Sequence, residues 1–178
     1  MKVTSYFIGL EVRSEVLADL FVGLYQYFDE CGCLDIVEFQ NPLSVHLTLY
    51  YLDNLIDEKL VQDELRDVVG EFGMNELGDF NGQIFYLTGS GLNGLKTEFE
   101  RYKVLFPNDV FENGLEFVPH VTLFRVLDKK RFEEVRKGVQ LLVQEFLEDL
   151  GARSVSEGRV SLYKVNSSFW PELQVKTG

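Results

Sequence analysis

The spacing of apolar and polar positions along the chain predicts an alternation of short strands and amphipathic helices. Runs rich in β-branched and aromatic residues, often with apolar residues at every second position, predict strands. These runs lie at residues 3–10, 34–39, 45–52, 83–88, 116–126, 159–165 and 172–176. Apolar residues recurring every three or four positions predict helices at residues 12–28, 57–72, 95–102 and 128–150. The elements do not follow a strict βαβ order, so the pattern predicts an α+β fold.

One strand pattern occurs twice, with a histidine at the same position in each copy. Residues 46–52, HLTLYYL, align with residues 120–126, HVTLFRV. Each copy runs into a polar turn and then into an amphipathic helix that an aspartate, Asp57 or Asp128, is suited to cap. A duplicated strand–helix unit predicts two lobes related by a pseudo-twofold axis. We therefore expect a bilobal molecule with antiparallel or mixed sheets around a central cleft.

His46 and His120 are the only histidines in the chain, and each is followed two positions later by a threonine. Because side chains alternate along a strand, His46 and Thr48 project to one face, and His120 and Thr122 do the same. Imidazole titrates near neutral pH, so one ring can accept a proton while the other donates one. The two hydroxyls can hydrogen-bond phosphate oxygens. One His-x-Thr is common in structural strands, but two copies that use every histidine favour a catalytic pair.

Composition and net charge limit the kinds of ligand that such a site can bind. The 178 residues carry a formal net charge of −12, which disfavours binding of long nucleic acids but leaves a small nucleotide or an RNA end open. The length fits one bilobal domain spanning residues 1–178. No apolar run is long enough to span a bilayer and the first residues read as a strand, so we expect a cytoplasmic protein with no membrane partner. Cys31 and Cys33 are expected to be reduced thiols near a helix end.

The two motifs together resemble those of the 2H phosphoesterase superfamily, most closely its 2′-5′ RNA ligase/2′,3′-cyclic phosphodiesterase (LigT-like) branch. The resemblance rests on residues 46–49, HLTL, and on residues 117–125, FVPHVTLFR. It extends over nearly the whole chain, from YFIGL at residues 6–10 to VSLY at residues 160–163. It implies a bilobal α+β fold and an active site that needs neither metal nor cofactor. It also implies hydrolysis of 2′,3′-cyclic phosphates of nucleotides or RNA ends to 2′-phosphates, and reversible 2′-5′ RNA joining.

Carried over to this chain, the resemblance gives each motif residue a role. His46 and His120 form the catalytic pair, with His46 assigned as the acid that protonates the leaving ribose oxygen and His120 as the base that activates water. Thr48, Thr122 and Arg125 are the candidate phosphate ligands. Strict alternation from His120 would put Arg125 on the opposite face, so its role requires a bulge or twist in the strand. The competing interpretation is a surface or interlobe arginine.

Two departures from the branch leave the choice of substrate open. Tyr50 and Tyr51 follow the first motif, where related sequences often carry a basic or otherwise polar residue, and the segment 74–82 between the lobes looks short. Tyr50 and Phe117 can offer a stacking face for a base, with core packing as the competing interpretation.

Other motifs point to other classes but fit less well. Residues 89–94, GSGLNG, match part of the dinucleotide-binding fingerprint, with Asp109 twenty residues after the first glycine. Pro107 interrupts the strand that this fold requires, and Leu95 occupies the position of the P-loop lysine. No carboxylate–histidine cluster has metal-ligand spacing, so no metal is expected. The remaining alternative is a nucleotide- or RNA-end-binding module that uses the same cleft without turnover. The oligomeric state stays open, with a monomer as the default expectation.

Overall fold

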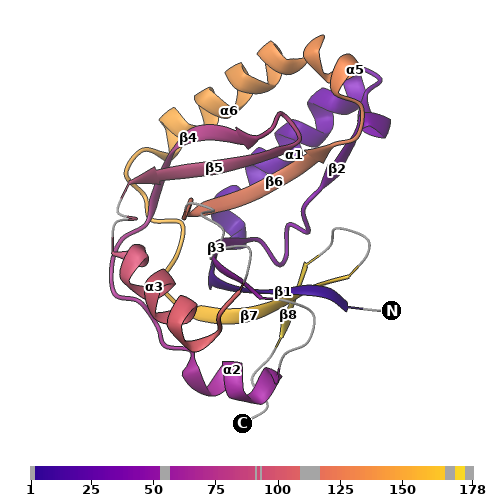
Figure 1. Ribbon diagram of the computed structural model, residues 1–178. Coiled ribbons are helices and arrows are strands. Elements are labelled where there is room, and N and C mark those ends of the chain that lie inside the picture. The colour runs from indigo at the N-terminus through magenta and orange to yellow at the C-terminus, as the bar shows by residue number, and fades with distance from the viewer. Residues whose placement is uncertain are drawn as a thin grey trace.

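The computed structural model describes residues 3–52, 57–90, 92, 94–108, 117–166 and 171–174 (Figure 1). The strands are β1 (Val3–Glu11), β2 (Val37–Phe39), β3 (His46–Leu52), β4 (Gly73–Phe80), β5 (Ile84–Ser90), β6 (His120–Val126), β7 (Val160–Asn166) and β8 (Pro171–Gln174). The helices are α1 (Ser14–Glu30), the short 3₁₀ helix η1 (Leu34–Ile36), α2 (Glu58–Glu64), α3 (Leu95–Leu105), α5 (Lys129–Glu133) and α6 (Arg136–Leu150). None of the helices in these ranges is long and apolar enough to cross a membrane.

The strands form one sheet in the order β4-β5-β6-β3-β1-β7-β8, with β2 also paired to β6. Neighbouring strands run antiparallel throughout. The two histidine strands, β3 and β6, are neighbours at the centre of this order and share a short register, Leu47 opposite Val121 and Thr48 opposite His120. More extensive pairing lies on either side of this junction, in β4–β5–β6 and in β3–β1–β7. The fold is therefore the predicted α+β arrangement of two lobes that meet at the histidine strands.

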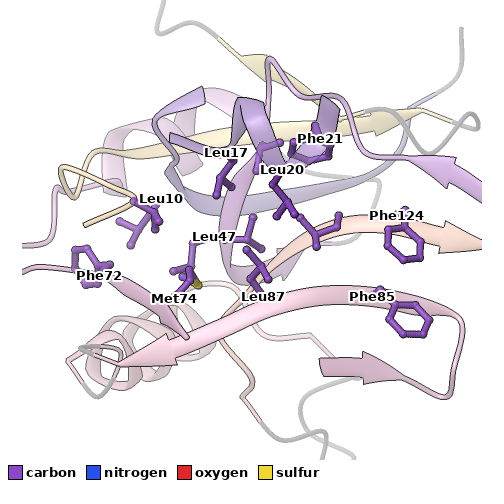
Figure 2. Packing of buried hydrophobic residues seen from close by; sticks show 14 of the residues in the cluster. Leu10, Leu17, Leu20, Phe21, Leu47, Phe72, Met74, Phe85, Leu87 and Phe124 are labelled. Carbon is purple, nitrogen blue, oxygen red and sulfur yellow. The ribbon is translucent and has the colours of Figure 1, made fainter. Parts of the chain in front are cut away.

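The helices bury their apolar faces against the sheet. α1, α5 and α6 gather beside β4, β5 and β6, whereas α2 and α3 lie near β3 and β7 (Figure 1). Leu17 and Leu20 of α1 point towards the strands, where Leu47 and Leu87 meet them in the core (Figure 2). These four side chains are at most 1% exposed. Val121 of β6, like Leu47 of β3, is 0% exposed, so burial of apolar side chains on both motif strands fixes the position of the strand backbones, and with them the histidines.

The helix predicted at residues 57–72 is wrong in its second half. α2 begins as predicted, with Asp57 as its cap, but it ends at Glu64. Beyond that point the backbone bonds to a distant segment, because the amide of Val68 donates to the carbonyl of Gly158 over 2.8 Å. The amide of Val68 thus bonds to a distant segment instead of to a helical carbonyl four residues earlier, although apolar residues continue at helical spacing up to residue 72.

The segment 74–82, which looks short beside related sequences, forms most of β4 and the turn of a hairpin in which β4 pairs with β5. Asn81 and Gly82 have φ angles of 55° and 66°, the left-handed conformation of both central residues of a type I′ turn, and the amide of Gln83 donates to the carbonyl of Phe80 across this turn. Gly89 of β5 lies so close to β4 that a Cβ there would be 2.2 Å from the carbonyl oxygen of Gly73. The first glycine of the dinucleotide-like motif therefore serves strand pairing. The motif residues Gly91, Asn93 and Asp109 lie outside the described residues.

The helix predicted at residues 128–150 is divided into α5 and α6. Asp128 caps α5 as predicted. The two helices meet at Val135, whose carbonyl accepts a hydrogen bond from the Tyr27 hydroxyl of α1 over 3.4 Å. Gly138 leaves the room that this tyrosine occupies, because a Cβ there would lie 1.8 Å from the hydroxyl oxygen. This contact between α1 and the junction of α5 and α6 joins residues far apart in the sequence, so apolar periodicity could not predict the break in the helix.

Candidate active site

The two histidine motifs meet where β3 and β6 pair. Thr48 lies directly opposite His120. Residues opposite one another in antiparallel strands project to the same face of the sheet. Alternation along each strand then places His46 beside Thr48 and Thr122 beside His120 on that face. We call the surface defined by these four residues the histidine face.

Both imidazole rings are oriented by the same backbone contact. Nδ1 of His46 lies 3.2 Å from the carbonyl oxygen of Ser44, and Nδ1 of His120 lies 2.6 Å from that of Val118. A carbonyl oxygen can only accept, so in each neutral ring Nδ1 carries the proton and Nε2 carries the lone pair. Nε2 is therefore the nitrogen of each ring that is suited to exchange protons with a substrate.

The ring of His46 is packed flat between two strands of the lobe formed by β3, β1 and β7. It stacks on Tyr163 of β7, with ring centroids 4.1 Å apart and planes inclined by 23°. On β1, a Cβ at Gly9 would lie 2.8 Å from Cδ2 of His46, so this position requires glycine. His46 is 5% exposed and Tyr163 2%. The first histidine is thus rigidly held and almost fully desolvated.

The ring of His120 has looser aromatic neighbours in the other lobe. Phe80 of β4 approaches it edge-on, with centroids 5.1 Å apart and planes inclined by 86°. Tyr86 of β5 lies 5.3 Å away at 58°. The ring of Tyr86 in turn covers Gly78, where a Cβ would lie 2.6 Å from it. His120 is half-buried, so it retains more access to solvent than His46.

Burial sets the charge state of both histidines. Desolvation, with a smaller contribution from the positive charge of His120, lowers the pKa of His46 to about 4. Desolvation also lowers the pKa of His120, against the hydrogen bond to Val118, which raises it. Both rings are therefore neutral in the unliganded protein at pH 7. Two charged rings would repel each other, and His120 is the more exposed of the two, so a single proton on the pair is better solvated on His120.

Solved structures match the fold of this chain, although no family model and no curated protein matches the sequence. The crystal structure of a phosphoesterase aligns with a TM-score of 0.57 over 97% of this chain and 94% of the other, at 12% identity. Apo LigT of E. coli aligns with a TM-score of 0.57 over 98% and 95%, at 13% identity. LigT complexed with phosphate gives 0.54 over 98% and 94%, at 14% identity.

The chain has the fold of a LigT-like phosphoesterase. The bilobal α+β architecture that the two motifs imply is thereby confirmed, and it extends over nearly the whole chain.

Within this LigT-like fold, a bulge in each motif strand changes which side chains reach the histidine face. In β3, Thr48 pairs with Gly9 but Tyr50 pairs with Ile8, so Leu49 is passed over. In β6 the register shifts in the same way, and Leu123 is passed over. Leu49 and Leu123 are each the third residue after the histidine of their strand. The extra residue reverses the alternation beyond it. Tyr51 and Arg125, each five residues after its histidine, consequently return to the histidine face.

Arg125 therefore lies on the face that its predicted role requires, but it has a protein partner there. Its guanidinium pairs with the carboxylate of Glu38, the residue directly opposite it on β2. Both side chains are about one-third exposed, with relative accessibilities of 33% and 31%. The structure thus brings Arg125 to the site and, at the same time, neutralises its charge.

The two candidate base-stacking residues lie in the hydrophobic interior or against it. Tyr50 is 0% exposed, and its hydroxyl donates to the carbonyl of Phe106, so its predicted stacking role is wrong. The cause is the bulge, which turns this side chain into the core of its lobe. Phe117 is partly buried and stacks on Phe99 of α3, with centroids 4.7 Å apart. That contact favours the packing interpretation for Phe117.

Several residues that shape the site were not identified from the sequence. They are Gly9, Phe80, Tyr86 and Tyr163, together with Glu38, the partner of Arg125. A glycine inside the strand pattern at residues 3–10 was the one available signal, because an interior strand glycine often marks a close approach. The other contacts depend on strand order, which apolar spacing alone does not provide.

Two other features bear on the chemistry. In the described part of the chain, no group of three or more His, Cys, Asp or Glu side chains is arranged to hold a metal ion. An apolar hollow of about 900 Å³ lies between α1 and residues 38–43, with Phe21, Phe39 and Leu43 among its lining residues. Neither histidine lines this hollow, but Glu38, the partner of Arg125, does.

Proposed function

We propose that the chain is a phosphoesterase that opens 2′,3′-cyclic phosphates of nucleotides to 2′-phosphates. The observation that carries this proposal is the pair of imidazoles on one face, each anchored through Nδ1 and each beside a threonine. Cyclic phosphodiester hydrolysis requires one group that removes a proton from water and one that supplies a proton to the departing ribose oxygen. Two imidazoles can supply both transfers, so the proposed reaction uses neither a metal nor a cofactor.

In the proposed reaction, Nε2 of neutral His46 accepts a proton from water as the water oxygen attacks phosphorus in line with O3′. The P–O3′ bond breaks, and the Nε2 proton of charged His120 passes to O3′, while the phosphate stays on O2′. One proton enters the pair and one leaves it, so proton exchange with solvent restores the starting state. The hydroxyls of Thr48 and Thr122 donate to non-bridging oxygens as charge develops on them.

This assignment reverses the one made from the sequence, which took His46 as the acid and His120 as the base. The base must be neutral before the reaction, and the deeply buried His46, with its pKa lowered to about 4, meets that condition over a wide pH range. The acid must hold a proton, and His120, the more exposed ring, is the better-solvated place for the single proton of the pair.

Ligand complexes of LigT support a nucleotide-type substrate. LigT structures include complexes with phosphate and with 3′-AMP, which align with this chain over almost its full length. The same chemistry extends to 2′-5′ joining, as the motif resemblance implies. If the 5′-hydroxyl of a second RNA replaces water, the same attack leaves a 2′,5′-phosphodiester and a protonated O3′.

The test is product analysis after incubation with 2′,3′-cyclic AMP. We expect 2′-AMP, formed equally well in EDTA, and formed at least ~10²-fold more slowly by a variant carrying both His46→Ala and His120→Ala. Tight binding of the cyclic nucleotide without any turnover would instead favour the alternative of a binding module. Formation of 3′-AMP would show that the other P–O bond breaks and would overturn the proposed geometry. Activity lost in EDTA and restored by one divalent ion would overturn the metal-independent mechanism.

A further inference from the structure

The charged side chains on or beside the histidine face lie next to side chains of opposite charge in the same protein. Arg125 is paired with Glu38, as described above. Glu11, directly opposite His46 on β1, accepts a hydrogen bond from the Ser161 hydroxyl and lies 3.8 Å from the Arg159 guanidinium. Both arginines therefore have a glutamate beside them.

A third carboxylate adds to the acidic side of this balance. Glu76 of β4 lies opposite Thr88 of β5 and is exposed. Alternation along β5 puts Thr88 on the same face as Tyr86, and Tyr86 lies opposite Thr122. Desolvation raises the pKa of Tyr86, and the negative charges of Asp79 and, to a smaller extent, Glu76 raise it further. Glu11, Glu38 and Glu76 thus outnumber Arg125 and Arg159 among the described side chains that we place on or beside the histidine face.

The position of Arg125 defines which phosphate it could reach. It lies five residues beyond His120, roughly 13 Å further along the strand at about 3.3 Å per residue once the bulge is allowed for. A guanidinium at that distance is suited to a second phosphate of an extended substrate rather than to the cyclic phosphate at the histidines. Glu38 occupies the guanidinium and places a negative charge where such a phosphate would lie, which disfavours a polyanion.

We infer that Glu38 is a specificity determinant that restricts the site to substrates with a single phosphate charge, namely mononucleoside 2′,3′-cyclic phosphates, and disfavours cyclic-phosphate ends of RNA. This inference rests on the proposed function and concerns substrate choice alone. The Glu38–Arg125 ion pair makes the histidine face selective against added phosphates, and the strongly acidic chain, with a net charge of −12, acts in the same direction.

The test compares kcat/KM for 2′,3′-cyclic AMP and for a six-nucleotide RNA with a 2′,3′-cyclic phosphate end, at low salt. The wild-type protein should favour the mononucleotide. Glu38→Gln releases Arg125 from the ion pair without removing it, and we expect the RNA-to-mononucleotide ratio to rise about tenfold, mainly through a lower KM for RNA. Glu133→Gln is the matched control, because it makes the same charge change beside Arg136 on the helical surface.

A double variant shows whether Arg125 mediates the gain. If it does, Glu38→Gln with Arg125→Gln returns the ratio to near the wild-type value. A wild-type protein that prefers the RNA, or a ratio that Glu38→Gln and Glu133→Gln change equally, would overturn the inference and leave the proposed function standing. Absence of turnover with both substrates would overturn the proposed function itself.

Discussion

The His46 half of the site and the His120 half are built on the same strand pattern but are packed differently. Both rings donate Nδ1–H to the carbonyl two residues earlier, and both strands carry a bulge three residues later. His46, however, lies flat on Tyr163 and over Gly9, whereas His120 meets the edges of aromatic rings and keeps some solvent access. The shared pattern thus provides two equivalently anchored imidazoles, and the unequal packing makes one ring more buried than the other, which suits the different roles of a base and an acid.

The largest expected effect comes from removing either half. His46→Ala and His120→Ala should each lower kcat for a 2′,3′-cyclic nucleotide by ~10²-fold or more, the scale of losing one general acid or base. The double variant should be little worse than the poorer single variant, because residues that act as a unit are not additive. Steady-state kinetics on all three variants measure this. Near wild-type turnover by either single variant would show that the two halves are not complementary.

The second effect concerns stability and distinguishes the buried half from the half-buried one. The pKa of His46 is about 4 in the folded protein and near 6.5 when unfolded, so the unfolded chain binds more protons between these values. Stability from this residue is therefore present above pH 6.5 and lost as the pH falls towards 4. We expect a loss of about 2 kcal/mol from this residue between pH 7 and pH 5.

Urea unfolding of wild type and His46→Asn at both pH values measures that difference. Asparagine retains an N–H donor for the Ser44 carbonyl but does not titrate. The variant should lose less free energy of unfolding on acidification than the wild type. An identical loss in both proteins would show that His46 is not held neutral by the fold.

The sequence alone predicted the parts of both halves that depend on local pattern. His46, Thr48, His120 and Thr122 follow from two copies of a tripeptide and from strand alternation. The structure confirms that they share a face. Strand alternation is a local property, so one sequence is sufficient to recognise it.

The differences between the halves could not be predicted in this way. The contact of His46 with Tyr163 joins residues more than a hundred positions apart and depends on β3, β1 and β7 being neighbours. The strand β4, which supplies Phe80, was missed because its apolar content is low. The bulge that turns Tyr50 inward depends on the register of β3 against β1. Register and strand order arise from tertiary packing, and this is where the prediction failed.

The pH dependence of the rate is the third test, and it assigns the roles. The productive state has His46 neutral and His120 protonated, and both pKa values are lowered by burial. We expect a bell-shaped profile of kcat/KM with its optimum in acid, between about pH 4 and the lowered pKa of His120. Above the optimum the rate should fall about tenfold per pH unit as the acid loses its proton.

The pH profiles of the residual kcat/KM of His46→Ala and His120→Ala then show which histidine produces each limb of the bell. His46→Ala should lose the acidic limb, because the base is gone, and His120→Ala should lose the alkaline limb. The opposite result would restore the assignment made from the sequence, with His46 as acid. An optimum at pH 8 or above would contradict the lowered pKa values in both halves.

The smallest expected effect comes from substituting one glycine in each half of the site, Gly9 or Gly78, by alanine. At Gly9 an added Cβ would lie 2.8 Å from Cδ2 of His46 and 3.0 Å from the Leu47 carbonyl oxygen, so Gly9→Ala must displace a catalytic ring or its strand. At Gly78 the added Cβ would meet the ring of Tyr86, which contacts His120 only from the side.

Misplacing a reacting group by about 1 Å can cost up to about 10²-fold in rate, so a shift of a few tenths of an ångström at Gly9→Ala should lower kcat on the order of tenfold. Gly78→Ala should lower kcat by about threefold or less, since Tyr86 can move without displacing the ring of His120. Steady-state kinetics, with circular dichroism to confirm that both variants fold, measure the two effects. Equal losses would mean that the tight packing around His46 does not position the base, and the difference between the halves would then reside in solvent access alone.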